Sequence, residues 1–346
     1  MRIGFFTESY FPEIDGVTYT INSWKESLEE KGHEVYIIYP SSKDYEPVER
    51  EIPVKSLPNP FYSGYNIPIP LVDVPELDVI HCHGPGPLCR YAKRHAKKNN
   101  IPSVYTHHTP IEDYFEQSVK SKKAAKLLSK IYVPIENRFL KDFDVITAST
   151  PNINRNVEHQ QLPVGVDLEF FQPTESKMFE DMKRPVTGYS GRISNEKNVE
   201  ELVKFAETFE GTLVIIGEGP KKKLIKSAAS DNVVFKDFLS REKLPEFYTS
   251  IDVFLTASTG DTLGLSTLEA NACGTPVVAA DVYPFNNTIN EENGLRYQKG
   301  NLKDLKEKVE TTLNKDFNTR EAVKKYSLEN TIENLEEIYF DLNNAD

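Results

Sequence analysis

Ser258-Thr-Gly-Asp-Thr-Leu-Gly-Leu-Ser-Thr-Leu-Glu-Ala-Asn-Ala-Cys-Gly-Thr-Pro-Val-Val-Ala-Ala-Asp281 follows closely on a short apolar run at residues 253–255. Its polar beginning predicts a loop, residues 265–272 predict a short helix that ends near Gly274, and residues 277–280 predict a second strand. Strand, loop, helix and strand in this order form the repeating unit of a parallel sheet covered by helices.

Two carboxylates in this stretch, Asp261 before the helix and Glu269 within it, suggest a binding site. A helix start presents unpaired N–H groups and the positive end of the helix dipole, which suit a phosphate. Eight helical residues rise about 12 Å, so the two carboxylates can contact opposite ends of an elongated, hydroxyl-rich ligand. An ordinary strand–helix unit with a polar loop and a solvated Glu has the same spacing, so the spacing alone leaves both interpretations open.

Short apolar runs alternate with amphipathic stretches along almost the whole chain of 346 residues, which is longer than one hydrophobic core normally requires. The strands expected from these runs are residues 3–6, 34–39, 79–82, 103–106, 145–148, 186–189, 212–216, 233–235, 253–256 and 276–279. Helical patterns lie between them, for example at residues 17–30, 199–209 and 244–250. The pattern predicts an α/β protein of two doubly wound, Rossmann-like domains facing each other across a cleft, with the change of domain near residues 162–173.

Composition excludes several classes of protein. The net charge of −12 disfavours a general nucleic-acid binder. No apolar segment reaches 18 residues and the N-terminus does not resemble a signal peptide. The three cysteines, Cys82, Cys89 and Cys273, match neither a disulfide framework nor a zinc pattern, so we expect a cytoplasmic protein with buried, inert thiols.

Glycines and basic residues follow several of the expected strands. Gly191-Arg192 follows residues 186–189, with Lys197 five positions later, and these two cations can contact a diphosphate. Gly217 follows residues 212–216, and Gly16 precedes the helix expected at residues 17–30. Glycine at such positions lets the backbone approach a phosphate, a base or a ribose. Solvated basic turns and ordinary glycine turns explain the same residues.

Histidines end two strands of the first half. His81 and His83 lie at the end of the strand expected at 79–82, and His107 and His108 follow the next one. His83 and His108 are candidates for contacting a sugar or acceptor hydroxyl. Four histidines also raise the question of a metal, but they are not accompanied by an acidic ligand set, and we expect no metal site.

Together these motifs resemble the retaining nucleotide-sugar glycosyltransferases of the GT-B fold, family 4. The stretch from Asp261 to Glu269 matches the paired-acid E-x7-E element of that family. Gly191-Arg192 with Glu196-Lys197-Asn198, Gly217-Glu-Gly-Pro220 and Gly165-Val-Asp-Leu-Glu-Phe-Phe-Gln-Pro173 also resemble family segments. The resemblance covers nearly the whole chain and implies a GT-B enzyme with an acceptor-binding domain at residues 1–165. It further implies a nucleotide-sugar domain at residues 166–326 and a terminal helix, 327–346, that packs back toward the first domain.

The resemblance also implies roles for single residues. Arg192 and Lys197 bind the donor diphosphate and stabilise it as it leaves, Glu269 holds the ribose, and Asp261 holds hydroxyls of the transferred sugar. His108 lies near the sugar on the acceptor side. Gly16 leaves room beside the phosphates, and the remaining nucleotide-binding positions are Gly191, Gly217, Leu263, Gly264 and Leu265. The donor implied is a UDP-sugar or a GDP-sugar, with UDP favoured, and neither a metal nor another cofactor is expected.

Two positions depart from the family pattern. Asp261 stands where Glu is more usual, and Leu263 replaces a common Phe. Because the aspartate side chain is one methylene shorter, its reach differs and the identity of the donor sugar stays open.

One segment is strongly basic. Residues 90–141 carry 12 Lys or Arg against 4 Asp or Glu, a net of +8, while the rest of the chain is near −20. Within it, residues 118–133 predict a basic amphipathic helix that suits an anionic membrane surface. A soluble helix with a solvated basic face is the alternative. Tyr105-Thr-His-His-Thr-Pro-Ile-Glu-Asp-Tyr114 followed by this helix resembles the lipid-glycosylating branch, such as diacylglycerol glycosyltransferases. We therefore expect a membrane lipid or a lipid-linked glycan as acceptor, and a peripheral position at the inner face of the cell membrane.

Other functions remain as alternatives. A nucleotide-sugar 2-epimerase shares the fold, although the paired acids argue against it. A non-catalytic sugar-nucleotide-binding relative is disfavoured by Arg192, Lys197 and Glu269 but is left open by Asp261. A Rossmann dehydrogenase is disfavoured because no Gly-x-Gly-x-x-Gly follows the first strand.

Overall fold

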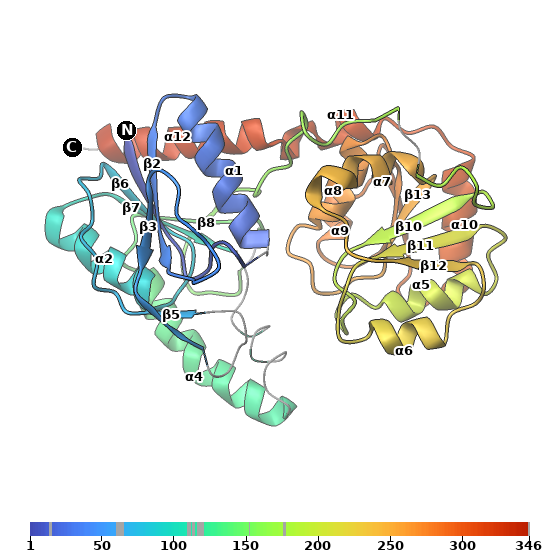
Figure 1. Cartoon of the computed structure of the whole chain (residues 1–346), viewed down its shortest axis with the longest axis horizontal. Helices are drawn as coiled ribbons and strands as arrows, with labels where there is room; N and C mark the ends of the chain where they lie inside the picture. Colours follow the sequence, from blue (N-terminus) through green and yellow to red (C-terminus); the bar gives the residue numbers. More distant parts are fainter. Residues whose placement is uncertain are drawn as a thin grey trace. The chain divides into compact units, whose positions relative to one another are not determined.

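Two large parallel sheets organise this chain, one in each of two units (Figure 1). The first unit comprises Met1–Val164 together with Glu329–Asp346, and the second comprises Gly165–Leu328. This computed structural model describes residues 1–13, 16–59, 66–108, 112, 115, 121–151, 153–175 and 178–344, and of Lys122 only the backbone.

The first sheet has seven strands in the order β3-β2-β1-β6-β7-β8-β9, and all of its strand pairs are parallel. Its strands are β1 (Arg2–Phe6), β2 (Glu34–Pro40), β3 (Glu51–Val54), β6 (Val79–Cys82), β7 (Ser103–His107), β8 (Val145–Ala148) and β9 (Gln160–Gln161). The helices of this unit are α1 (Gly16–Glu30), α2 (Pro87–Asn99), α4 (Lys122–Leu140) and α12 (Leu328–Asn344). A small antiparallel pair, β4 (Ser56–Pro58) and β5 (Asn66–Pro68), lies outside the main sheet.

Helices cover both faces of this sheet, which explains why successive residues of its central strands β1, β6 and β7 are buried. On one face Ile80 packs in a buried cluster with Leu88 of α2. On the other face the ring of His81 contacts Trp24 of α1 and Tyr339 of α12. The alternation of side chains along β6 therefore serves two separate layers.

The second sheet has six parallel strands in the order β12-β11-β10-β13-β14-β15. They are β10 (Val186–Ser190), β11 (Thr212–Ile216), β12 (Val233–Lys236), β13 (Val253–Thr256), β14 (Val277–Ala280) and β15 (Gly294–Tyr297). Its helices are α5 (Val199–Ala206), α6 (Lys222–Ser227), α7 (Leu244–Ser250), α8 (Leu265–Ala272), α9 (Phe285–Thr288), α10 (Leu302–Leu313) and α11 (Thr319–Val323), with short 3₁₀ turns at Arg241–Lys243 and Lys324–Tyr326. This is the Rossmann strand order, in which the winding direction reverses between β10 and β13 and ligands bind beyond the strand ends at that point.

The expected α/β class is confirmed, and the strands predicted from apolar runs are present. One of them is displaced: the strand expected at 276–279 is Val277–Ala280, because Pro276 has no N–H to contribute to the ladder. The helix expected at 199–209 ends at Ala206, where Thr208 and Phe209 donate to carbonyls only three residues back and tighten the last turn.

The C-terminal helix α12 packs on the first unit, far in sequence from its contacts there. Its Tyr339 hydroxyl lies 2.6 Å from Nδ1 of His81, and Glu336 Oε1 lies 2.8 Å from Nε2 of His33. Leu335 is fully buried. The end of the chain is therefore part of the core of the first unit.

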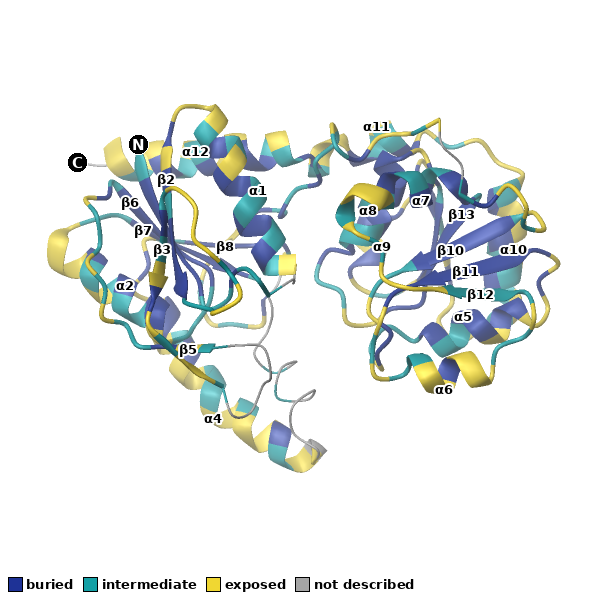
Figure 2. Ribbon diagram, viewed as in Figure 1, coloured by how far each residue is buried: buried dark blue, intermediate teal, exposed yellow. Residues whose placement is uncertain are grey.

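Helix α4 contains most of the basic segment predicted to contact membranes, while residues 118–120 of that segment lie outside the described residues. Ser121 caps the helix by accepting a hydrogen bond from the Ala124 N–H. Much of α4 is exposed, whereas the central strands of the two large sheets are buried (Figure 2). None of the helices in the described part of the chain combines the length and apolarity needed to cross a lipid bilayer.

Candidate functional site

The loops after β10 and β11 approach each other so closely that glycine is required. Gly191 and Gly217 have φ values of 152° and 141°, which side-chain-bearing residues rarely adopt. A Cβ on Gly217 would lie 2.0 Å from the carbonyl oxygen of Gly191. The Gly191 N–H donates to the Ile216 carbonyl at 3.1 Å, which holds the two strand ends together. The backbone conformation and the close packing of these loops therefore explain why both residues are glycine.

Lys197 and Asp261 form an ion pair between the loops that follow β10 and β13. Lys197 Nζ lies 2.6 Å from Asp261 Oδ1, and both side chains are about four-fifths buried, with 21% and 22% exposure. Two backbone-anchored contacts hold these loops in register: Thr259 N–H donates to the Glu196 carbonyl, and the Asn198 amide donates to the Ala257 carbonyl. The fold therefore brings a predicted cation and a predicted acid together where the sheet winding reverses.

Arg192 follows the same strand but is exposed. Within the described residues its guanidinium makes no hydrogen bond or ion pair, while its backbone carbonyl accepts a hydrogen bond of 2.9 Å from the Tyr189 hydroxyl. Burial raises the pKa of Tyr189, and the nearby charges of Asp261 and Glu196 raise it further, so this phenol stays protonated and can donate. The backbone of Arg192 is thus fixed while its charge is available to a ligand.

Glu269 on α8 is held by a buried tyrosine of α7. The Tyr248 hydroxyl donates to Glu269 Oε2 at 2.7 Å, and Tyr248 itself is fully buried. Burial raises the pKa of Glu269, while the hydrogen bond from Tyr248 and the positive charge of Arg241 oppose that rise. One carboxylate oxygen is therefore occupied, and the orientation of the other is set.

The start of α8 has the form expected for an anion site. Gly264 is its N-cap in the left-handed region, and no side chain caps the first turn. A Cβ at Gly264 would lie 2.7 Å from the Phe285 ring. Leu263 is buried at 4% exposure and Leu265 is the first helical residue. The helix start therefore presents N–H groups rather than side chains toward a ligand.

Gly16 and His108 belong to the first unit, whereas the other predicted site residues belong to the second. Gly16 is the first residue of α1, and a Cβ built there would meet no atom of the described residues within 4 Å, so packing against these residues does not explain a glycine. His108 follows β7, and its Nε2 lies 3.0 Å from Nδ1 of His83.

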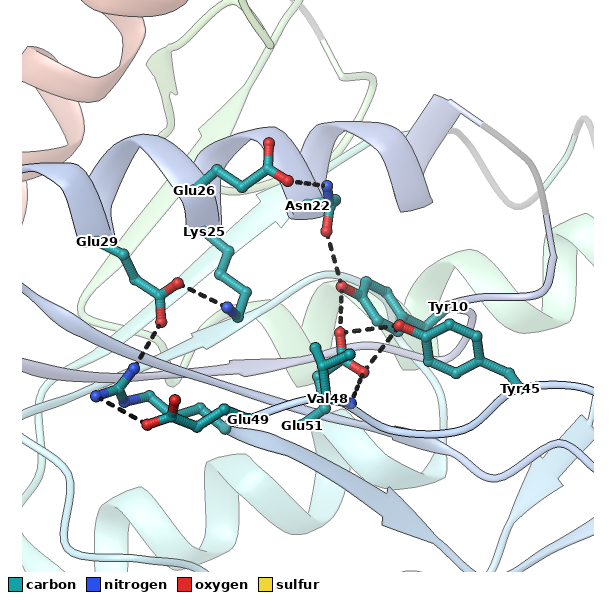
Figure 3. Close-up of polar contacts among 10 residues, drawn as sticks. Tyr10, Asn22, Lys25, Glu26, Glu29, Tyr45, Val48, Glu49 and Glu51 are labelled. Atoms are coloured by element: carbon teal, nitrogen blue, oxygen red, sulfur yellow. Dashed lines mark hydrogen bonds and ion pairs between the residues drawn. The ribbon is translucent and has the colours of Figure 1, made fainter. Parts of the chain in front are cut away.

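The loop that leads from β1 to α1 is anchored by a carboxylate that the sequence did not point out (Figure 3). Glu51 Oε1 lies 3.0 Å from the Tyr10 hydroxyl, and Glu51 Oε2 accepts from the Tyr45 hydroxyl at 2.9 Å and from the Val48 N–H at 3.1 Å. The Tyr10 hydroxyl is also 3.1 Å from Asn22 of α1. These contacts fix Tyr10 against α1 and β3, and the Tyr10–Glu51 contact joins residues 41 positions apart, which explains why no local motif indicated it.

A second carboxylate that the sequence analysis missed is Glu8, directly after β1. Glu8 Oε1 accepts hydrogen bonds of 3.0 Å from the N–H groups of Leu88 and Cys89 at the start of α2. A Cβ on Gly86 would lie 2.3 Å from the Glu8 carboxyl carbon. Burial raises the pKa of Glu8 to about 7, although the two N–H donors oppose this. Glu8 is thus a buried carboxyl group at a helix start whose charge changes near neutral pH.

Histidines, cysteines and acids do not converge on a metal in the part of the chain that the structure describes. No group of three or more such side chains is arranged to hold an ion. The three cysteines are free and buried, and burial raises the pKa of Cys273 to about 12, which keeps it a thiol.

Comparison with known proteins gives a consistent family. Residues 171–330 match the family described as glycosyl transferases group 1, and residues 14–169 match glycosyltransferase family 4. An alpha-monoglucosyldiacylglycerol synthase of Streptococcus pneumoniae is 30% identical over 329 residues, which cover 84% of this chain and 74% of the relative. A second alpha-monoglucosyldiacylglycerol synthase, from Acholeplasma laidlawii, is 29% identical and covers 99% of this chain and 97% of its own.

Solved structures agree on the fold. Sucrose-phosphate synthase from Thermosynechococcus elongatus superposes with a TM-score of 0.76 at 20% identity, covering 100% of both chains. Anabaena HepE in complex with UDP superposes with a TM-score of 0.74 at 14% identity, covering 99% of this chain and 100% of the other. With its two parallel Rossmann-like sheets and these matches, the chain belongs to glycosyltransferase family 4, has the GT-B fold and is a glycosyltransferase.

Proposed function

We propose that this enzyme transfers a hexose, with retention of configuration, from a UDP-sugar to the hydroxyl of a membrane lipid of the diacylglycerol type. The two relatives described above are named for glucosylation of diacylglycerol, and one of the two solved structures is a complex with UDP. Both points favour a UDP-hexose and a lipid over the alternatives of a GDP-sugar and a lipid-linked glycan.

On the donor side, the second unit supplies the groups that a sugar nucleotide requires. Arg192 has no competing partner among the described residues, and Lys197 is a positive charge already held in place by Asp261 at 2.6 Å. We assign the diphosphate to these two cations and to the start of α8. Cations positioned before the reaction stabilise the charge that develops on the departing diphosphate without having to reorganise.

Glu269 and Asp261 are assigned to the two ends of the donor. The carboxylate of Glu269, with one oxygen occupied by Tyr248, would accept hydrogen bonds from the ribose. Asp261 would accept hydrogen bonds from the transferred sugar through the oxygen that does not contact Lys197. His108 and Gly16 in the first unit are assigned to the sugar and to the room beside the phosphates.

The observation that carries the lipid acceptor is the exposed apolar face of α4. Leu127, Leu128, Ile131 and Ile135 are 59%, 40%, 56% and 47% exposed. Residues 127, 131 and 135 recur every four positions and thus form one stripe along the helix. Lys123, Lys126, Lys130 and Arg138 on the same helix are exposed too. Apolar side chains flanked by cations match the boundary of an anionic bilayer. The apolar side chains enter the acyl region, and the cations contact the headgroups.

A transfer assay tests the proposal. The protein is incubated with UDP-glucose, UDP-galactose or GDP-mannose and with vesicles that contain diacylglycerol and phosphatidylglycerol. We expect a hexosyl-lipid from a UDP-sugar, with an α anomeric proton by NMR. Product only with GDP-mannose, or a β product, would overturn the assignment of donor or stereochemistry. Conversion of a UDP-sugar in the absence of acceptor would instead indicate the epimerase.

Vesicle sedimentation tests the role of α4. The double variant Leu127→Ser and Ile131→Ser should lose most vesicle binding, whereas Leu224→Ser, at a leucine of the second unit that is 64% exposed, should bind normally. Equal binding of both variants, or no binding of the unmodified protein at low salt, would remove the membrane from the proposal.

A further inference from the structure

His83 and His108 form a pair of imidazoles at the ends of two neighbouring strands. His83 Nδ1 lies 3.0 Å from His108 Nε2, and the ring planes are inclined by only 24° with centroids 5.3 Å apart. β6 and β7 are hydrogen-bonded neighbours in the sheet, so the register of the two strands sets this contact.

Both rings are neutral near pH 7, because burial lowers the pKa of His83 well below its usual value and lowers that of His108 to about 3. A neutral imidazole carries one N–H and one bare nitrogen. In a hydrogen bond between two such rings, one must donate and the other must accept. The tautomers of the two rings are therefore coupled. Nε2 of His83 is buried and has no partner among the described residues, and a buried N–H without an acceptor is rarer than a buried bare acceptor, so the favoured arrangement has the proton of His83 on Nδ1. Nε2 of His108 then accepts the hydrogen bond, and Nδ1 of His108 carries the proton.

Among the described residues, the side chain of His83 has no hydrogen-bond partner other than His108. Its ring lies among Phe5, Trp24 and His81, with ring centroids 4.9, 5.7 and 4.2 Å away. Its second nitrogen, Nε2, is buried and has no hydrogen-bond partner among the described residues, and the whole residue is 4% exposed. An apolar ring would suit this pocket better, since an unsatisfied buried polar atom is costly. The contact with His108 is the polar interaction that a phenylalanine at this position would lack.

His81, two residues earlier on the same strand, shows the contrasting case. Its Nδ1 lies 2.6 Å from the Tyr339 hydroxyl and its Nε2 lies 2.6 Å from Thr106 Oγ1. Both of its nitrogens are used in joining α12 and β7 to β6, which is a structural role. His83 has one nitrogen engaged, and that nitrogen contacts a residue assigned to the reaction.

We propose that His83 is a positioning residue, which holds the ring of His108 in one orientation and one tautomer so that His108 Nδ1 has a single hydrogen-bonding character toward a bound hydroxyl. The part that concerns catalysis rests on the function proposed above. His108 is partly exposed, and its Nδ1 makes no hydrogen bond to the residues that the structure describes, so this atom is available to a ligand. A hydroxyl needs either a donor or an acceptor at a given position, and a mixture of tautomers would leave part of the molecules with the wrong one.

Long-range ¹H–¹⁵N NMR of histidine-labelled protein tests the proposal without any substrate. The chain has 7 histidines, and the variants His108→Gln and His83→Phe identify the two signals by their loss. In the unmodified protein we expect ¹⁵N shifts of His108 that correspond to one tautomer. In His83→Phe they should become those of a rapidly exchanging mixture. A mixture in the unmodified protein, or an unchanged pattern in His83→Phe, would overturn the proposal whatever the enzyme transfers.

The variant His83→Asn provides the rescue. Its amide can place a hydrogen-bonding group at the position of Nδ1, so it should restore the hydrogen bond to His108 Nε2 and move the ¹⁵N shifts of His108 back toward those of the unmodified protein, and it also serves if His83→Phe does not fold. With the hexosyl transfer assay, kcat should fall about tenfold in His83→Phe and recover in His83→Asn, as expected for the loss of one hydrogen bond. Unchanged kcat in a folded His83→Phe would contradict the role in positioning. Absence of transfer by the unmodified protein would count against the proposed function, and the NMR result would still decide the inference.

Discussion

Lys197 Nζ and Asp261 Oδ1 are 2.6 Å apart, although 64 residues separate them in the chain. The contact joins the loops after β10 and β13, at the point where the sheet of the second unit reverses its winding. It holds the ammonium of Lys197, which we propose contacts the diphosphate, in a fixed position. Pre-positioned charge of this kind is the main contribution that a protein can make to the departure of a diphosphate.

Lys197→Ala should therefore lower kcat by about 10²–10³-fold, by analogy with the removal of one preorganised donor from an oxyanion site. The measurement is steady-state transfer with the preferred UDP-sugar. Lys221→Ala is the matched control, because Lys221 forms an ion pair of the same 2.6 Å length with Glu200 in the same unit. Near-normal turnover in Lys197→Ala would remove this residue from the site.

Tyr248→Phe should weaken donor binding and shift its pH dependence upward. The Tyr248 hydroxyl stabilises the ionised form of Glu269, so its loss raises the pKa of that carboxyl further above the usual value. The carboxylate is then ionised only at higher pH, and the pH at which KM for the donor reaches its low plateau should rise. Tyr297→Phe, which removes a 2.9 Å hydrogen bond to Glu201, should leave the profile unchanged. Identical profiles for all three proteins would show that Glu269 does not contact the donor.

Glu8→Gln should stabilise the protein at neutral pH and have less effect in acid. The pKa of Glu8 is about 7 in the folded state against 4.5 for an unperturbed carboxyl, so folding takes up a proton between these values and stability falls as pH rises through that window. This difference in pKa corresponds to a loss of about 3 kcal/mol in the free energy of unfolding at pH 7.5, and the loss is absent below pH 4.5. Urea midpoints of Glu8→Gln and of Glu30→Gln, an exposed control, at pH 4.5 and 7.5 measure it. Parallel midpoints for Glu8→Gln and the unmodified protein at both pH values would contradict the prediction.

Arg155→Met should destabilise the first unit by about 3–5 kcal/mol, because it leaves the buried carboxylate of Glu136 and the partly buried one of Glu112 without their cation. The side chain of Arg155 is 0% exposed and contacts Glu136 at 2.7 Å and Glu112 at 2.6 Å. Arg184→Met breaks an exposed pair with Asp252 and should cost less than about 1 kcal/mol. Urea denaturation of both variants provides the comparison. Equal losses in the free energy of unfolding would show that burial does not make the contacts of Arg155 with Glu112 and Glu136 more important for stability than an exposed pair.

The sequence predicted β10 to β14 of the second sheet because short apolar runs between polar loops are buried wherever they pack. It did not predict β15, whose residues Gly-Leu-Arg-Tyr form no apolar run. Strands that exist only through pairing with a neighbouring strand were not predicted. β9 consists of Gln160–Gln161, two exposed polar residues that count as a strand only through pairing with β8. Likewise, the Glu51 contacts with Tyr10 and Tyr45 depend on the packing of loops and left no local pattern.

The sequence by itself determined the α/β class, the positions of Gly191, Arg192, Lys197 and Asp261 at strand ends, and the basic helix. These follow from hydrophobic period and from residue types at short spacing, which are local properties. Only the tertiary structure decided that Asp261 contacts Lys197, that Glu269 is held by Tyr248 and that His108 is held by His83. Strand register and helix packing set those contacts, and both depend on the burial of surfaces far apart in the chain.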